Sequence, residues 1–141
     1  MNYDETTQTS VDPGRAWSAL SAVTTYPRWT SSMTTVTPLD GTDLAIGHRF
    51  RIKQPGLPAV VWQVTELSEG ESFTWEAHSP GVHSVAFHRV HPTAGGTQIV
   101  IGLRQTGSLA GLLKMLTETK TRRFLRLEAA GLKAAAEATS A

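Results

Sequence analysis

The sequence predicts an α+β fold in which an antiparallel sheet of about six to seven strands wraps around a long C-terminal helix. Turn-forming residues separate short strand-like stretches between positions 33 and 106, at the spacing of β-hairpins. After position 108 the pattern changes, and leucines recur at the period of an amphipathic helix. Strands that precede a helix in one block indicate an α+β layer fold, and 141 residues suit a single domain over residues 1–141.

The N-terminal segment predicts a first strand and two short helices. Residues 2–11 contain several threonines that alternate weakly with other residues, which favours a strand. Asp12 is a typical N-cap, and Pro13 suits the first position of a helix. We expect Tyr26-Pro27 to interrupt that helix because a residue before proline avoids helical backbone angles. Arg28-Trp29 should then begin a second short helical turn.

The middle of the chain predicts a meander of strands joined by tight turns. Asp40-Gly41, Pro80-Gly81 and Ala94-Gly95-Gly96 are turn signals, and the stretch 68–71 is another. The strands predicted between and beside these turns span residues 33–38, 48–53, 60–67, 72–78, 82–91 and 97–106.

The last third of the chain predicts one amphipathic helix of ~25 residues over the stretch 109–136. Lys114, Arg122, Arg126 and Lys133 fall on the side opposite the apolar stripe, whereas Lys120 falls within the stripe. We expect residues 138–141 to fray into solvent. The apolar stripe comprises Leu109, Leu112, Leu113, Leu116, Phe124 and Leu127.

Four local motifs follow one another in an order and spacing that are typical of a known superfamily. They are PGRAWSAL at 13–20 with Tyr26-Pro27-Arg28-Trp29 after it, a hairpin from Leu39-Asp40-Gly41 to Gly47-His48-Arg49-Phe50, a second hairpin from Val90-x-Pro92 to Gly96-Thr97-x-Ile99, and a long helix that opens at Gly107-Ser108-Leu109 and carries Gly131-Leu132-Lys133 near its end. Together they resemble the SRPBCC superfamily, which includes the START lipid-transfer domains and the birch-pollen-allergen fold. The similarity is closest to the bacterial polyketide cyclase/dehydrase-like group, and it covers nearly the whole chain.

The resemblance implies a helix-grip fold with a ligand cavity between the sheet and the C-terminal helix. It therefore implies that the protein binds a small hydrophobic or aromatic metabolite, lipid-like or polyketide-like. Two alternatives stay open, because one fold hosts many functions. One is an enzyme of the polyketide cyclase/dehydratase type that uses the same cavity. The other is a domain whose cavity is filled by side chains and which acts through a protein partner.

Hairpin spacing also predicts which strand residues face the helix. If Leu67 pairs with Ser72 across their turn, Val64 lies opposite Trp75, and paired residues share one face of a sheet. A one-residue slip would invert every assignment. The same reasoning across the next two hairpins yields an inner set of Trp62, Val64, Phe73, Trp75, Ala86, His88, Val90, Ile99, Ile101 and Leu103.

From this set we predict the ligand-contacting residues. Leu116 would add a contact from the helix, and Trp29 would lie at the cavity mouth or pack as a lid over the sheet edge. Aromatic residues such as these line cavities or simply fill cores. The predicted contacts are Trp29, Trp62, Val64, Phe73, Trp75, Ala86, His88, Ile101, Leu103 and Leu116.

His88 is the one polar side chain in the inner set. It is either a polar handle or general acid/base for a ligand, which makes it the candidate catalytic residue, or a core histidine satisfied by neighbouring groups. Lys120 either pairs with a ligand carboxylate or reaches water from an irregular stretch of helix, since the threonines around it are poor helix formers.

Composition argues against several other classes of function. The chain contains no cysteine, and its five histidines do not converge, so we expect neither a metal site nor a cofactor. A net charge of +1 and basic residues on a solvated helix face argue against nucleic-acid binding. The sequence shows no signal peptide and no apolar run long enough for a membrane span, so we expect a cytoplasmic protein. Nothing in the sequence indicates an oligomeric state.

Overall fold

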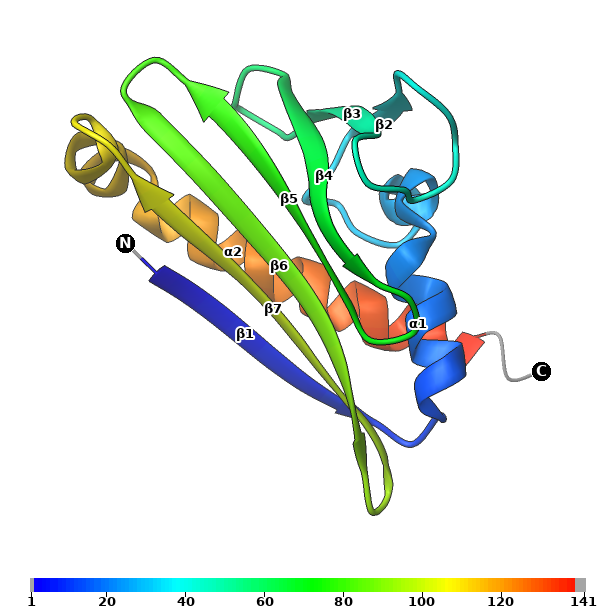
Figure 1. Cartoon of the computed structure of the whole chain (residues 1–141). Helices are drawn as coiled ribbons and strands as arrows, with labels where there is room; N and C mark the ends of the chain where they lie inside the picture. Colours follow the sequence, from blue (N-terminus) through cyan, green and yellow to red (C-terminus); the bar gives the residue numbers. More distant parts are fainter. Residues whose placement is uncertain (1, 139–141) are drawn as a thin grey trace.

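The computed structural model describes residues 2–138 and shows one seven-stranded antiparallel sheet crossed by a long helix, as the sequence predicts (Figure 1). The strand order across the sheet is β1-β7-β6-β5-β4-β3-β2, so each strand from β2 to β7 pairs with its neighbour in sequence and β1 joins the far edge. The strands are β1 Asn2–Thr9, β2 Thr35–Pro38, β3 Arg49–Lys53, β4 Val60–Ser68, β5 Ser72–Ser79, β6 Val82–Thr93 and β7 Gly96–Thr106.

Two short helices follow β1, namely α1 at Pro13–Ser21 and the 3-10 helix η1 at Val23–Arg28. The expectation that Tyr26-Pro27 interrupts the first helix and that Arg28 starts the second is wrong, because η1 contains both residues and ends at Arg28. Pro27 lies late in a short 3-10 helix, where its missing N–H removes little hydrogen bonding. The Tyr26 hydroxyl donates to the carbonyl oxygen of Leu20, which ties η1 to α1.

The start of α1 is capped as the sequence predicts. Asp12 Oδ1 accepts a hydrogen bond from the backbone N–H of Arg15 at 3.0 Å, and Pro13 occupies the first helical turn. We expect Asp12→Ala to lower the free energy of unfolding by ~1 kcal/mol, because one amide of the first turn loses its acceptor. Urea denaturation measures this loss. An equal loss in Asp4→Ala, an exposed carboxyl on β1, would contradict a specific capping role.

The predicted register holds across two hairpins and is corrected in the third. Phe73 pairs with His88, and His88 pairs with Ile101, as expected. The β4–β5 turn is one residue tighter than predicted: Ser68, not Leu67, pairs with Ser72, and Glu71 donates its backbone N–H to the Ser68 carbonyl.

A β-bulge in β4 cancels that error. The register shifts between Val64 and Glu66, so Thr65 is an extra residue in β4 and Val64 lies opposite Trp75 as predicted. From the Val64–Trp75 pair to the ends of β4 and β5 away from the turn, the residues on the inner face are therefore the predicted ones, although the turn that joins the two strands is different.

The outer face carries one large aromatic side chain, whose packing explains its position. Phe87 pairs with Gly102, and its ring lies over the space that a Gly102 side chain would fill. The Arg104 guanidinium lies 5.7 Å from the centre of the same ring. Phe87 therefore covers a glycine of the neighbouring strand.

The long helix α2, Ala110–Ala138, lies along the inner face of the sheet (Figure 1). Its C-terminal half enters the core, where Leu125, Ala129, Leu132 and Ala136 are buried. The predicted stripe is only partly right, because Leu109, Leu112 and Leu116 are exposed and Leu127 is half-buried. Ala138 is still helical, contrary to the expected fraying from 138 onward, and residues 139–141 of that expectation lie outside the described part.

Candidate ligand cavity

The inner face of the sheet is divided into two halves, one filled and one open. Near the β4–β5 turn, Val64 and Phe73 pack with Trp17 of α1 and with the C-terminal half of α2 in the hydrophobic core. Toward the other end of the strands, the N-terminal half of α2 stands off from the sheet. A cavity of about 410 Å³ lies there, between the sheet and α2.

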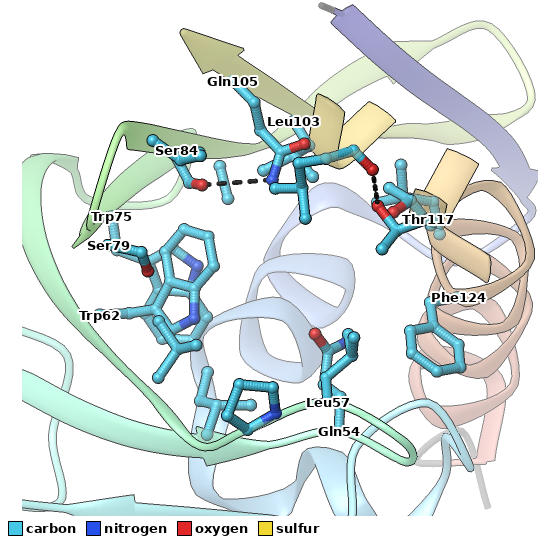
Figure 2. A pocket seen from close by; sticks show the side chains of 18 of the residues that line it. Gln54, Leu57, Trp62, Trp75, Ser79, Ser84, Leu103, Gln105, Thr117 and Phe124 are labelled. Atoms are coloured by element: carbon cyan, nitrogen blue, oxygen red, sulfur yellow. Dashed lines mark hydrogen bonds between the residues drawn. The ribbon is translucent and has the colours of Figure 1, made fainter. Parts of the chain in front are cut away.

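Alternation along the strands supplies the sheet side of this cavity. Trp62, Trp75, Ala86, His88, Ile101 and Leu103 come from four consecutive strands and all point to the inner face. Figure 2 shows the Trp62 and Trp75 rings together on one wall, with Phe124 of α2 across the cavity from them. The two indole rings are 6.1 Å apart and tilted by 38°. This wall presents a broad aromatic surface to the cavity.

Aliphatic residues of α2, of the segment just before it and of the loop between β3 and β4 form another part of the lining. Leu109, Leu112 and Leu116 line the cavity although they are 46%, 50% and 72% exposed, respectively. Leu57 and Pro58 approach from the β3–β4 loop. Because apolar side chains that line a cavity are also exposed to solvent, this end is its mouth.

Polar groups in the outer part of the cavity bond mainly to each other or to their own element. Gln105 Nε2 donates to Ser84 Oγ at 3.3 Å, across β7 and β6. The Thr117 hydroxyl donates to the carbonyl oxygen of Leu113, one turn back along α2 (Figure 2). These hydrogen bonds are made within the protein, so the outer cavity presents mostly apolar surface to a ligand.

A buried histidine and a buried carboxylate face each other at the inner end of the cavity. His88 on β6 is 3% exposed and Glu128 on α2 is 7% exposed, and both line the cavity. His88 Nε2 lies 3.7 Å from Glu128 Oε1, beyond hydrogen-bond distance. Neither His88 Nδ1 nor Glu128 Oε1 has a hydrogen-bond partner among the described residues.

Aromatic rings hold His88 in place. The imidazole stacks on Phe73 with ring centres 4.0 Å apart and an interplanar angle of 5°. Trp75 meets it edge-on at 5.5 Å. The ring therefore cannot turn without disturbing the core, and its two nitrogens keep fixed directions.

Sequence reasoning did not identify Glu128 as a site residue. Its position carried a signal, because Phe124, Glu128 and Leu132 are spaced four residues apart and so share one face of a helix. The structure shows all three as buried. The Glu128 charge acts on its surroundings: burial raises the pKa of the Tyr26 hydroxyl well above its usual value, and the nearby Glu128 carboxyl raises it further.

Seven of the ten predicted contact residues line the cavity and three do not. Val64 and Phe73 point to the inner face but lie in the half that α1 and α2 fill, so the core covers them. Trp29 packs against Tyr26, at a ring distance of 4.6 Å, and against Gly131, which places it outside the cavity lining. The seven in the lining are Trp62, Trp75, Ala86, His88, Ile101, Leu103 and Leu116.

Lys120 also lies outside this lining. Its ammonium group approaches Gly56 of the β3–β4 loop, on a small separate depression that Arg123 and Leu127 share. The helix is regular through the threonines around Lys120, contrary to the expected irregular stretch.

Metal and membrane features are absent from the described chain. Residues 2–138 contain no group of three histidine, aspartate or glutamate side chains placed to hold a metal ion. His78 and His83 stack across the β5–β6 hairpin with ring centres 4.4 Å apart. Neither α1 nor α2, the α-helices in this part of the chain, combines the length and apolar character needed to cross a bilayer.

Solved structures with the same fold include proteins from several bacteria and Ara h 8.0201. TTHA0849 from Thermus thermophilus is 14% identical with a TM-score of 0.80, over 100% of both chains. MLL2253 from Mesorhizobium loti is 16% identical with a TM-score of 0.73, also over 100% of both chains. Ara h 8.0201 is 10% identical with a TM-score of 0.65, over 94% of this chain and 97% of that chain.

At these identities the structural similarities establish the fold alone. A search of curated proteins found no match to the sequence. The family model described as "Polyketide cyclase / dehydrase and lipid transport" matches residues 2–137, nearly the whole chain. The helix-grip architecture, the SRPBCC-type motifs and this match agree, and the chain belongs to the polyketide cyclase / dehydrase and lipid transport family.

Proposed function

We propose that this protein binds a small hydrophobic or aromatic molecule, lipid-like or polyketide-like, in the cavity between its sheet and α2. The observation that carries the proposal is the cavity itself, about 410 Å³ in volume and lined mostly by apolar side chains. Typical ligand pockets measure roughly 300–1,000 Å³ and combine an apolar lining with a few polar groups. The exposed leucines at the mouth support an apolar ligand, because they offer it a continuous path into the cavity.

The alternative of a domain whose cavity is filled by side chains has less support. The side chains of the inner face fill only the half beside α1, and the half beneath the N-terminal part of α2 is open. Apolar side chains that line an empty cavity lack the van der Waals contacts that they would make in a close-packed interior, and this lowers the stability of the protein. A bound apolar molecule restores those contacts.

Filling the cavity tests the proposal directly. Ala86 points into the cavity from the middle of β6, so we expect Ala86→Phe to occupy ligand space and lower the affinity for a hydrophobic fluorescent probe by ~tenfold or more. Titration of the wild-type protein with the probe should quench tryptophan fluorescence, because Trp62 and Trp75 form the wall. The variant should keep its circular dichroism spectrum and its unfolding midpoint.

Val85→Phe is the matched control for this experiment. Val85 neighbours Ala86 on the same strand but points to the outer face, where it pairs with Glu76 and Arg104. We expect this variant to bind the probe as the wild type does. If Ala86→Phe binds as tightly as Val85→Phe, the cavity is not the binding site.

An enzyme is the second candidate function, and the His88–Glu128 pair is the observation that favours it. A histidine next to a carboxylate, both buried at the inner end of an apolar cavity, is an arrangement used for general acid–base catalysis. The assay incubates the protein with polyketide-like substrates that carry acidic C–H groups and measures the formation of cyclised or dehydrated product. We expect His88→Phe to lower turnover ~10²-fold or more if His88 transfers a proton, and only to weaken binding modestly if it orients the ligand.

A further inference from the structure

We infer that His88 and Glu128 form a subsite for a ligand hydroxyl group, so that the cavity selects apolar alcohols or phenols over their ethers and carboxylates. The inference rests on the proposed function and deepens it. It starts from the buried carboxylate oxygen Glu128 Oε1, which has no hydrogen-bond partner among residues 2–138 and lies 3.7 Å from His88 Nε2. A buried polar group without a partner costs stability, and such groups in native proteins require an explanation.

The surroundings of the pair offer no partner of their own. Phe73 covers one face of the imidazole and Trp75 meets its edge, so apolar rings occupy the space around the histidine. Leu125 lies three residues before Glu128 on α2 and is buried in the cavity lining. The Ser84–Gln105 pair, which also lines the cavity, is joined by its own hydrogen bond. A ligand in the cavity is therefore the partner that the fold leaves room for.

The separation of the pair indicates which ligand group fits. His88 Nε2 and Glu128 Oε1 are 3.7 Å apart, which exceeds a direct hydrogen bond but allows one oxygen atom to lie within ~2.8 Å of both. That oxygen must donate to one side and accept from the other, because a carboxylate only accepts while the imidazole N–H donates. A hydroxyl is a neutral group whose single oxygen does both. It meets the requirement without bringing charge into the cavity.

The same chemistry disfavours related ligands. An ether or ketone oxygen accepts only, so it leaves the Glu128 oxygen without a donor. A ligand carboxylate also accepts only and places a second negative charge next to Glu128 in an apolar environment. Recognition by buried hydrogen-bonding groups gives strong discrimination, because the analogue lacking the hydroxyl leaves those groups unpaired.

Three naphthalene probes of similar size test the inference: 2-naphthol, 2-methoxynaphthalene and 2-naphthoate, titrated by calorimetry into the full chain. We expect the wild type to bind 2-naphthol ~tenfold or more tightly than the ether, and the carboxylate most weakly. Equal affinity for naphthol and ether would overturn the hydroxyl subsite while leaving the proposed function in place. Binding of none of the three would overturn the proposed function, and this inference with it.

Variants then place the selectivity on the two residues. In Glu128→Leu and in His88→Phe we expect the preference for 2-naphthol over the ether to vanish, while affinity for the ether stays within ~threefold of wild type. Glu118→Gln is the control, a half-exposed carboxyl on the same helix that pairs with Arg122 and lies outside the cavity lining. It should keep the full preference. A preference that persists in both cavity variants would overturn the assignment.

A measurement on the wild-type protein covers the case in which these variants do not fold. The ring nitrogens of His88 are observed by ¹⁵N NMR during the same titrations. We expect their signals to shift more on addition of 2-naphthol than on addition of 2-methoxynaphthalene, because only the hydroxyl bridges the ring and Glu128, whereas the ether oxygen can only accept from the ring N–H. Equal shifts with the two probes would overturn the inference.

Discussion

Replacing Trp75 by alanine should lower the free energy of unfolding by ~3–5 kcal/mol, because it removes the largest fully buried side chain at the centre of an aromatic cluster. Its ring centre lies 5.3 Å from that of Phe73, 5.9 Å from Phe50, 6.1 Å from Trp62 and 5.5 Å from His88. The truncation would also open the cavity wall into the core and release the edge-on contact that holds the His88 ring. Urea denaturation followed by circular dichroism measures the loss.

Trp62→Ala is the control for this prediction. Trp62 occupies the same wall but is only half-buried, so we expect a clearly smaller loss of stability. Both variants should weaken binding of an aromatic probe, and folding has to be verified before that effect is assigned to the cavity. A loss below ~1 kcal/mol in Trp75→Ala would contradict its central place in the packing.

Gly131→Ala should destabilise the protein by ~2–3 kcal/mol, although alanine is normally the better helix former by up to ~1 kcal/mol. A methyl group at this position would lie 2.4 Å from Cε3 of Trp29 and 2.5 Å from the Trp29 carbonyl oxygen. The backbone oxygen cannot move aside as a flexible side chain would, so α2 or the segment after η1 must shift. Thermal or urea unfolding measures the change.

Gly111→Ala provides the opposite expectation on the same helix. Nothing lies within 4 Å of a methyl group at Gly111, so the substitution should stabilise the protein by up to ~1 kcal/mol. If both glycine substitutions change the free energy of unfolding in the same direction, the close approach of α2 to Trp29 does not explain why residue 131 is glycine. If Gly131→Ala shifts α2, hydrophobic probe binding should weaken as well, because α2 forms one side of the cavity.

Most of the sheet and its inner face could be predicted from local pattern. Turn residues at hairpin spacing located β4 to β7, and period-two alternation then predicted that Trp75, Ala86 and His88 share one face. The tighter β4–β5 turn and the bulge near Thr65 could not be predicted, because each offsets the other in the final register. The number of residues between Val64 and Trp75 is the same with or without these two changes, so the spacing in the sequence does not reveal them.

The candidate site was predictable on the sheet and much less so on the helix. A strand shows two faces, so its pattern separates inside from outside. A helix that packs on α1 and the sheet over one half and covers a cavity over the other has no single apolar stripe. The leucine spacing therefore emphasised Leu112 and Leu116, which are exposed at the cavity mouth, and passed over Glu128, a carboxylate in an otherwise apolar face.

The sequence by itself determined the element order, the antiparallel sheet, the long C-terminal helix and the inward direction of His88, since these follow from periodicities of two and 3.6 residues and from turn chemistry. Only the tertiary structure decided that the inner face is half core and half cavity, that Val64, Phe73 and Trp29 belong to the packed part, and that Glu128 faces His88. The physical reason is that these facts depend on where α2 crosses the sheet. Close contacts such as that between Gly131 and Trp29 set that crossing, and they join residues about a hundred positions apart in the chain.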